Sequence, residues 1–292
     1  MVKVNYHGRL GNNLFQYCFG RILAEKYNQP LICDKINGFP NIKSIDDKSS
    51  YITNTNKMDL LGHYIDINNL PQNTNFILDG YYQRYSYFKY RKDDICRWLL
   101  CDAKPSYICE EKDVVVHIRL GDVCSEHEEH VENHRNITYA HHPLPLFYYI
   151  NAINSFNDIN KILILTEKNW IDHPQIKSLK SSFPQYDFIV ISDTIEKDFS
   201  TIVYANRIII SQSTFAWWSA FLSNATTIHS PLIGFWHPKS NRKINIIKSN
   251  GNFIDHEINL IVDDENRYIY HDLCEDPNMY VKDYYDKNPL SI

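Results

Sequence analysis

Val114-Val115-Val116-His117-Ile118-Arg119-Leu120-Gly121-Asp122 is the stretch that decides the fold of this chain. Three consecutive valines predict a short buried strand, and the glycine permits a tight turn after it. An arginine at the end of such a strand lies at the carboxyl edge of an α/β sheet, where these sheets bind ligands. Arginine can grip a phosphate at two points. Alternatively, Arg119 pairs with a nearby carboxylate, and this segment alone does not choose between the two.

Strands and helices alternate on both sides of this stretch. Val2–Tyr6 predicts a strand, Gly8–Asn13 a turn, the following residues to Tyr27 a helix, and Leu31–Cys33 a second strand. A second series of such units starts at Val114, which favours parallel sheets covered by helices. We therefore expect an α/β protein of two Rossmann-like halves with a cleft between them. The predicted domains are residues 1–112, residues 113–238, and a polar, then acidic segment 239–292 that packs on the core.

Composition narrows the class of protein. The net charge of −5 argues against a general nucleic-acid binder but leaves room for a locally basic phosphate pocket. The 21 tyrosines suit a sugar-binding surface, or simply form a tyrosine-rich core. The seven cysteines are odd in number and show no CxxC spacing, which favours free thiols. With no signal peptide or membrane-spanning stretch evident, we expect a cytoplasmic protein, at most peripheral to a membrane.

Two further segments carry candidate chemistry. Gly8–Asn13 joins a strand to a helix and offers donors on Arg9 and Asn12, although it matches neither GxGxxG nor the P-loop. Ser211–Trp218 joins another strand to a helix, and its hydroxyls and the helix N–H groups could cradle a phosphate. The alternative for the second segment is an ordinary serine or threonine N-cap.

Together these segments resemble the α-1,2-fucosyltransferase family. The family's glycine-rich motif is matched by Gly8–Tyr17 with Asn13 in place of glutamine, and Asp79–Gln83 also looks like a family segment. The remaining motifs, His117–Val123 and Ser213–Trp218, depart from the family pattern at three positions: Leu120, Val123 and Ala216. The resemblance runs in order from about residue 2 to residue 235.

The resemblance implies a GT-B-like enzyme that moves L-fucose from GDP-β-L-fucose to the 2-hydroxyl of a galactoside with inversion. It implies that Arg119 holds the β-phosphate and that His117 lines the same edge. It implies that Asp198 pairs with guanine, whose adjacent donors a carboxylate can accept. The other implied donor-binding residues lie near the diphosphate, fucose and nucleoside: Arg9, Gly11, Asn12, Ser213, Thr214 and Phe215.

Neither a general base nor a metal site is evident. Asp122, Glu126 and His127 are the candidates for the base because they follow Arg119, although Asp122 could instead brace the turn at Gly121. There is no Asp-x-Asp motif to hold a metal. The His-rich stretch 127–142 is polar and aperiodic, which favours an acceptor loop over a metal site. We expect no cofactor and no metal requirement, with GDP-fucose as donor and a glycan as acceptor.

Two other functions remain open. One is a different GDP-fucose enzyme, either an α-1,6-fucosyltransferase or a protein O-fucosyltransferase, against which the Phe215-x-Trp-Trp pattern favours the α-1,2 group. The other is a non-catalytic sugar-binding relative. The joint presence of Arg9, Asn12, Arg119 and Asp198 argues against that second alternative.

Overall fold

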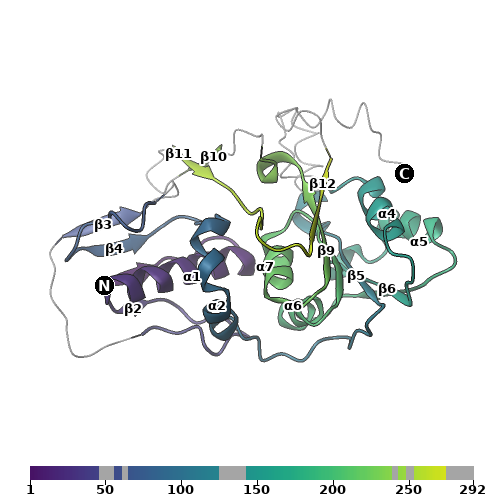
Figure 1. Cartoon of the computed structure of the whole chain (residues 1–292), viewed down its shortest axis with the longest axis horizontal. Coiled ribbons are helices and arrows are strands. Elements are labelled where there is room, and N and C mark those ends of the chain that lie inside the picture. Colours follow the sequence, from purple (N-terminus) through teal and green to yellow (C-terminus); the bar gives the residue numbers. More distant parts are fainter. Residues whose placement is uncertain (46–55, 61–64, 125–142, 239–242, 248–252, 274–292) are drawn as a thin grey trace. The chain divides into compact units, whose positions relative to one another are not determined.

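The computed structural model describes residues 1–45, 56–60, 65–124, 143–238, 243–247 and 253–273 (Figure 1). These residues form two compact units. The first consists of the described residues of 1–102 and 242–262, and the second of those of 103–241 and 263–292. Both units are built on parallel sheets, which confirms the α/β class. The arrangement of two Rossmann-like halves around a cleft stays a prediction.

The first unit ends ten residues earlier than the boundary predicted at residue 112, and the segment after residue 238 contributes to both units. Residues 103–112 belong to the second unit, and two of them bond to its helix α6 (Ile195–Val203). Ser200 donates its hydroxyl to the carbonyl of Ala103 at 2.8 Å, and the N–H of Ser106 donates to Thr201 Oγ1 at 2.9 Å.

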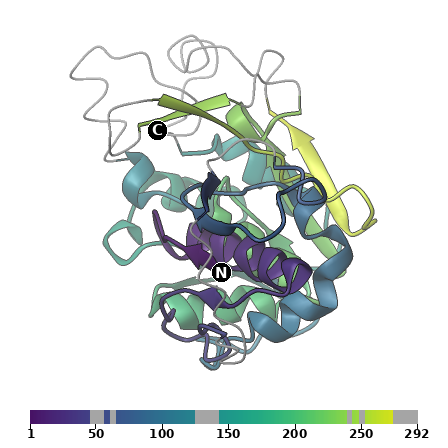
Figure 2. The ribbon, with the colours of Figure 1, turned by 90° about the vertical axis from the view of Figure 1, so that its left-hand side faces the viewer.

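The first unit contains a four-stranded sheet in the order β2-β1-β4-β3, and all its pairings are parallel. Helix α1 packs along β1 and β2 (Figures 1 and 2). A separate antiparallel pair joins β10 to β11. The elements of this unit are β1 (Val2–Val4), α1 (Leu10–Tyr27), β2 (Leu31–Ile32), β3 (Lys57–Leu60), β4 (Asn75–Leu78), 3-10 turns Tyr85–Tyr87 and Lys89–Arg91, α2 (Lys92–Trp98), β10 (Lys243–Ile247) and β11 (Phe253–Glu257).

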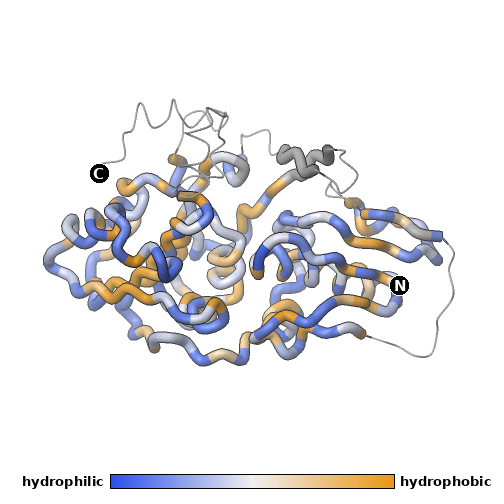
Figure 3. Tube along the Cα trace, turned by 180° about the vertical axis from the view of Figure 1, so that it is seen from behind, coloured by the Kyte–Doolittle hydropathy of each residue, from blue (hydrophilic) through white to orange (hydrophobic). Residues whose placement is uncertain are grey.

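The second unit contains a six-stranded, wholly parallel sheet in the order β12-β9-β8-β5-β6-β7. Its continuous apolar strands appear as hydrophobic runs in Figure 3, as expected where helices cover both faces. The elements are β5 (Val114–His117), α4 (Leu146–Asn154), β6 (Lys161–Leu165), 3-10 turn Lys168–Trp170, α5 (Pro174–Ser182), β7 (Asp187–Ile191), α6 (Ile195–Val203), β8 (Arg207–Ile209), α7 (Thr214–Leu222), β9 (Thr227–Leu232), 3-10 turn Gly234–Trp236 and β12 (Tyr268–Asp272).

The core of the second unit explains why the valine run is a strand. Val114 and Val116 on one face of β5 pack with residues of β6, α4 and α5, and all are almost fully buried. Helices α6 and α7 contact each other and lie on the other side of the strands in Figure 1. No helix in the described part of the chain is both long and apolar enough to cross a membrane.

Several predicted elements were wrong in extent. Helix α1 begins at Leu10, so Gly11, Asn12 and Asn13 lie in its first turn rather than in a loop. Strand β3 is an element that the sequence pattern did not predict. Strand β12 lies in the predicted C-terminal segment. Both strands are at sheet edges and are stabilised by pairing with a neighbour, which local sequence does not reveal.

Two histidines on neighbouring strands of the larger sheet, the buried His229 and the half-buried His271, form a hydrogen-bonded series with Ser155. Ser155 donates its hydroxyl to the carbonyl of Ala152 at 2.7 Å, so its oxygen accepts from His229 Nε2 at 3.1 Å. His229 Nδ1 therefore accepts from His271 Nε2 at 2.7 Å. This arrangement requires a neutral His229, because its Nδ1 must keep a lone pair to accept from His271. Burial, and secondarily His271, lowers the pKa of His229 to about 4.

We expect the buried His229 to make the stability of the protein sensitive to acid. The unfolded protein takes up a proton on His229 near its ordinary pKa of 6.5, whereas the folded protein resists until about pH 4. The free energy of unfolding should therefore fall by about 3 kcal/mol as the pH drops across that window. Urea denaturation at a series of pH values would measure it. The variant His229→Asn keeps a hydrogen-bond donor and an acceptor but does not titrate, so its free energy of unfolding should fall less steeply with decreasing pH than that of the wild type. If the two plots of unfolding free energy against pH are parallel, His229 is not the group responsible.

Candidate functional site

The order of the larger sheet reverses between β5 and β8. From β5 the chain proceeds outward through β6 to β7, and it then returns through α6 to place β8 on the other side of β5. The loops after β5 and β8 therefore leave the carboxyl edge in different directions. In open α/β sheets, ligands bind at such a reversal.

Arg119 spans this reversal. Its Nε and Nη2 donate to Oδ1 and Oδ2 of Asp122 at 3.0 and 2.6 Å, and its Nη1 donates to the carbonyl of Gln212 at 2.9 Å. A guanidinium has five N–H donors, so two remain after these three bonds. The side chain is 24% exposed. Arg119 is thus held on two sides while it still presents N–H groups for an anion.

Asp122 has a role that neither sequence interpretation named. Both of its carboxylate oxygens accept from Arg119, so it orients the guanidinium. Gly121 begins a helical segment, residues 121–124, and its backbone is not in the left-handed region. Arg119 therefore pairs with a carboxylate, as one of the two alternatives predicted, and its binding of a phosphate stays a prediction.

His117 ties the end of β5 to the loop after β8. Its Nδ1 lies 2.7 Å from Ser211 Oγ, and both side chains are buried. The ring of Phe215 packs against His117 with centroids 5.6 Å apart and also against Phe199 at 5.6 Å. These contacts link β5, α6 and α7 beside Arg119.

Helix α7 begins at this edge, directly after the buried N-cap residue Ser213. The Ser213 side chain makes no capping bond to the helix, although serine is a favourable N-cap residue. The first N–H groups of a helix lack intrahelical acceptors and attract anions. Thr214 and Phe215 are in this first turn and are half-buried. An anion at Arg119 therefore has a second source of donors nearby.

Asp198 lies in α6, three residues after the helix begins at Ile195. Its carboxylate accepts from the N–H of Asp193 at 3.2 Å and from the hydroxyl of Ser106 at 3.3 Å. Burial raises the pKa of Asp198 to about 6 despite these bonds. The side chain thus stabilises the loop between β7 and α6 and has lone pairs left to accept further donors.

The smaller sheet also reverses, between β1 and β4, and polar side chains join the loops there. Gln16 is buried; its Oε1 accepts from the N–H of His7 at 3.0 Å, and its Nε2 donates to the carbonyl of Gly80 at 3.0 Å. Asn12 Oδ1 accepts from Gln83 Nε2 at 2.9 Å, and His7 also bonds to Asp79. The two sequence motifs of this unit are therefore joined directly.

The predicted donor residues of this unit surround the start of α1. Gly8 has a φ of +76°, and a Cβ there would lie 2.3 Å from Asn12 Nδ2, so the turn requires glycine. Arg9 is the exposed N-cap residue, while Gly11 is buried and Asn12 half-buried in the first helical turn. Arg9 and Asn12 thus lie at the same helix start, and their role in donor binding stays a prediction.

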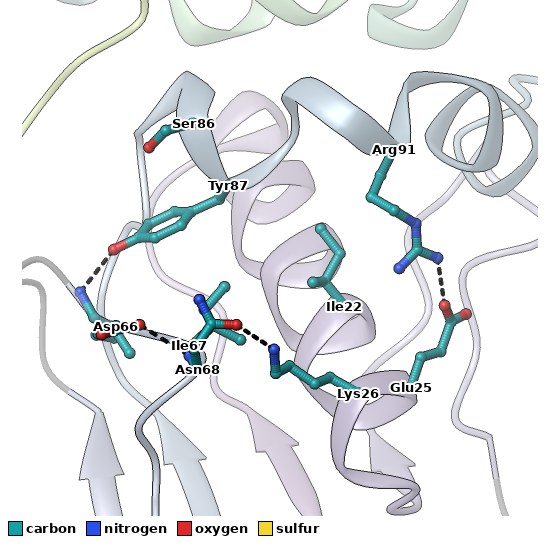
Figure 4. A pocket seen from close by; sticks show the side chains of 10 residues that line it. Ile22, Glu25, Lys26, Asp66, Ile67, Asn68, Ser86, Tyr87 and Arg91 are labelled. Atoms are coloured by element: carbon teal, nitrogen blue, oxygen red, sulfur yellow. Dashed lines mark hydrogen bonds and ion pairs between the residues drawn. The ribbon is translucent and has the colours of Figure 1, made fainter.

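A separate hollow of about 500 Å³ lies farther along α1 (Figure 4). Its lining includes Ile22 and Lys26, which are three to four turns beyond Asn12, or about 15–20 Å along the helix. Its polar groups are already paired: Arg91 with Glu25, and Lys26 with Asn68. We assign it no part in the site.

Some predicted residues cannot be placed. Glu126 and His127 lie outside the described residues, as does the His-rich stretch 127–142. Within the described part of the chain, no cluster of three or more His, Cys, Asp or Glu side chains could hold a metal. Metal independence therefore stays a prediction.

The sequence pattern indicated no role for three residues that join loops at the carboxyl edges of the sheets: Gln16 and Gln212 at the two reversals, and Glu167 between β5 and β6. Gln16 could have been noticed as a polar residue within the apolar run of α1. Glu167 follows β6 closely, much as Arg119 follows β5. The bond between Arg119 and the Gln212 carbonyl has no such local signal, because it joins residues 93 positions apart.

The model of glycosyl transferase family 11 matches residues 48–254, well over half of the chain. The chain belongs to glycosyl transferase family 11. It is therefore an enzyme of a fucosyltransferase family, with a nucleotide-sugar donor and a glycan acceptor. No curated protein matches the sequence.

The matched region of this family 11 glycosyltransferase includes Asp79–Gln83, His117–Val123, Asp198 and Ser213–Trp218. The turn at Gly8–Asn13 lies before the match begins. The roles predicted for Arg9, Gly11 and Asn12 consequently depend on the motif resemblance and on the bond that joins Asn12 to Gln83.

Proposed function

We propose that this protein transfers L-fucose from GDP-β-L-fucose to the 2-hydroxyl of a terminal galactoside, forming an α-1,2 linkage with inversion. We include in the proposal a GT-B-like arrangement, metal independence and a cytoplasmic location. Family membership supports fucosyl transfer, and the motif pattern around Trp217 and Trp218 supports the α-1,2 group.

The observation that carries the proposal is the geometry of Arg119. Its guanidinium is held by Asp122 and Gln212 at the reversal of a parallel sheet, and two N–H groups remain for a ligand. As fucose departs, negative charge develops on the β-phosphate oxygen. Fixed donors aimed at that charge stabilise the transition state more than the ground state.

The surrounding groups support a complete donor site. The start of α7 supplies further N–H donors for the diphosphate, and Ser213 and Thr214 add hydroxyls. Asp198 would accept the adjacent N1–H and N2–H donors of guanine. The acceptor hydroxyl would lose its proton to Glu126 or His127, which follow Arg119 in sequence.

The test is transfer from GDP-fucose to terminal galactosides such as lactose and N-acetyllactosamine, with EDTA present and product linkage read by NMR. We expect a new α-1,2 linkage. A product with another linkage would show that the proposed α-1,2 regiochemistry is wrong. Loss of turnover in EDTA would show that the enzyme requires a metal. Hydrolysis or transfer from a different nucleotide sugar, with none from GDP-fucose, would contradict the donor.

Arg119→Ala should abolish measurable transfer, with a loss of at least about 100-fold in kcat, because the leaving diphosphate loses its fixed donors. Circular dichroism should show that the variant remains folded. Arg207→Ala is the matched control, since Arg207 begins the neighbouring strand β8 and bonds to Asp158 instead. If the Arg119→Ala enzyme is active, Arg119 does not bind the leaving diphosphate as proposed.

GDP affinity should decrease as the pH falls through about 6, because Asp198 must be ionised to accept both guanine donors. Calorimetric titration with GDP and with IDP, which lacks the N2 amine, would isolate this contact. The wild-type protein should prefer GDP above pH 6, and Asp198→Asn should lose most of that preference. If both proteins prefer GDP over IDP to the same extent, Asp198 does not contact guanine and only stabilises the loop between β7 and α6.

A further inference from the structure

Glu167 lies where the backbone pairing between β5 and β6 ends. These strands pair in parallel up to His117 and Leu165, and Ile118 continues the ladder by donating its N–H to the carbonyl of Leu165 at 2.9 Å. Beyond that point β6 turns away into the 3-10 turn Lys168–Trp170. The N–H of Leu120 then donates to Glu167 Oε2 at 3.1 Å. A side-chain carboxylate thus replaces the strand as acceptor for the residue that follows Arg119.

The carboxylate of Glu167 also explains why residue 121 is a glycine. A Cβ on Gly121 would lie 2.9 Å from Glu167 Oε1 and 3.0 Å from its Cδ. The backbone of Gly121 is not in the left-handed region, so its conformation alone does not require glycine. The absence of a side chain allows Glu167 to approach Leu120.

We infer that Glu167 is a positioning residue for Arg119: its carboxylate holds the N–H of the Arg119–Leu120 peptide and so fixes the turn on which Arg119 and Asp122 pair. The inference rests on the proposed donor site, because it is the phosphate-binding geometry of Arg119 that Glu167 maintains. The turn is then held from both neighbouring strands, by Glu167 after β6 and by the Gln212 carbonyl after β8.

The experiment compares Glu167→Ala, Glu167→Gln, Gly121→Ala and the double variant Glu167→Ala/Gly121→Ala in the full chain. Glu111→Ala is the matched control, since Glu111 is exposed and precedes the opposite end of β5. GDP affinity is measured by calorimetry, and hydrogen exchange of the Leu120 amide is measured without ligand.

Glu167→Ala should bind GDP roughly tenfold more weakly and exchange the Leu120 amide faster, because one hydrogen bond of the turn is lost. Glu167→Gln retains an acceptor and should stay within about threefold of wild type. Gly121→Ala should resemble Glu167→Ala, because its methyl group displaces the carboxylate. In the Glu167→Ala background the same substitution should have little further effect, which is the mark of two residues acting through one contact.

Unchanged GDP affinity in Glu167→Ala and in Gly121→Ala would overturn the inference while leaving the donor site intact. Lower thermal stability with unchanged affinity would do so too, since it would show a purely structural role. If Glu167→Ala does not fold, Gly121→Ala and Glu167→Gln decide the question. Failure of the wild-type protein to bind GDP would instead contradict the proposed function, and the inference would fall with it.

Discussion

The guanidinium of Arg119 joins two loops that the sheet itself cannot join. Strands β5 and β8 are neighbours, but their loops diverge at the carboxyl edge, so backbone pairing ends there. Arg119 bonds on one side to Asp122 in its own loop and on the other to the Gln212 carbonyl. The positions of the α7 N-terminus and of the turn at Gly121 follow from these bonds. The site is rigid because a charged group has satisfied most of its donors within the protein.

The smaller sheet uses the same principle with a neutral side chain. At the reversal between β1 and β4, the amide of Gln16 bonds to the N–H of His7 and to the carbonyl of Gly80. An amide can serve both loops because it has a donor and an acceptor on one planar group. Its burial makes these bonds costly to lose. Polar motif residues at both reversals therefore stabilise the edges at which the proposed ligand-binding groups lie.

The sequence predicted the parts of this fold that local pattern determines. Apolar runs such as Val114–Val116 and Ile162–Leu165 are strands because helices cover both faces of the sheet. Strands β3 and β12 were missed because their stability comes from neighbours distant in sequence. Arg119 and Ser213 were predicted from strand ends, whereas the contact of Glu167 with Leu120 depends on the register between β5 and β6.

The charges around Arg119 suggest how an acidic protein would bind an anionic donor. The net charge of the chain is −5, and Asp122 balances the formal charge of Arg119. Long-range attraction of a diphosphate is therefore weak, and exposed charges are screened at physiological ionic strength. Affinity must then come from directed N–H groups on Arg119 and at the start of α7, whose strength depends on alignment. We therefore expect small displacements of the Arg119 turn to weaken binding more than the loss of a surface charge would, so that the carboxylates bonded to this turn contribute to affinity through the arginine.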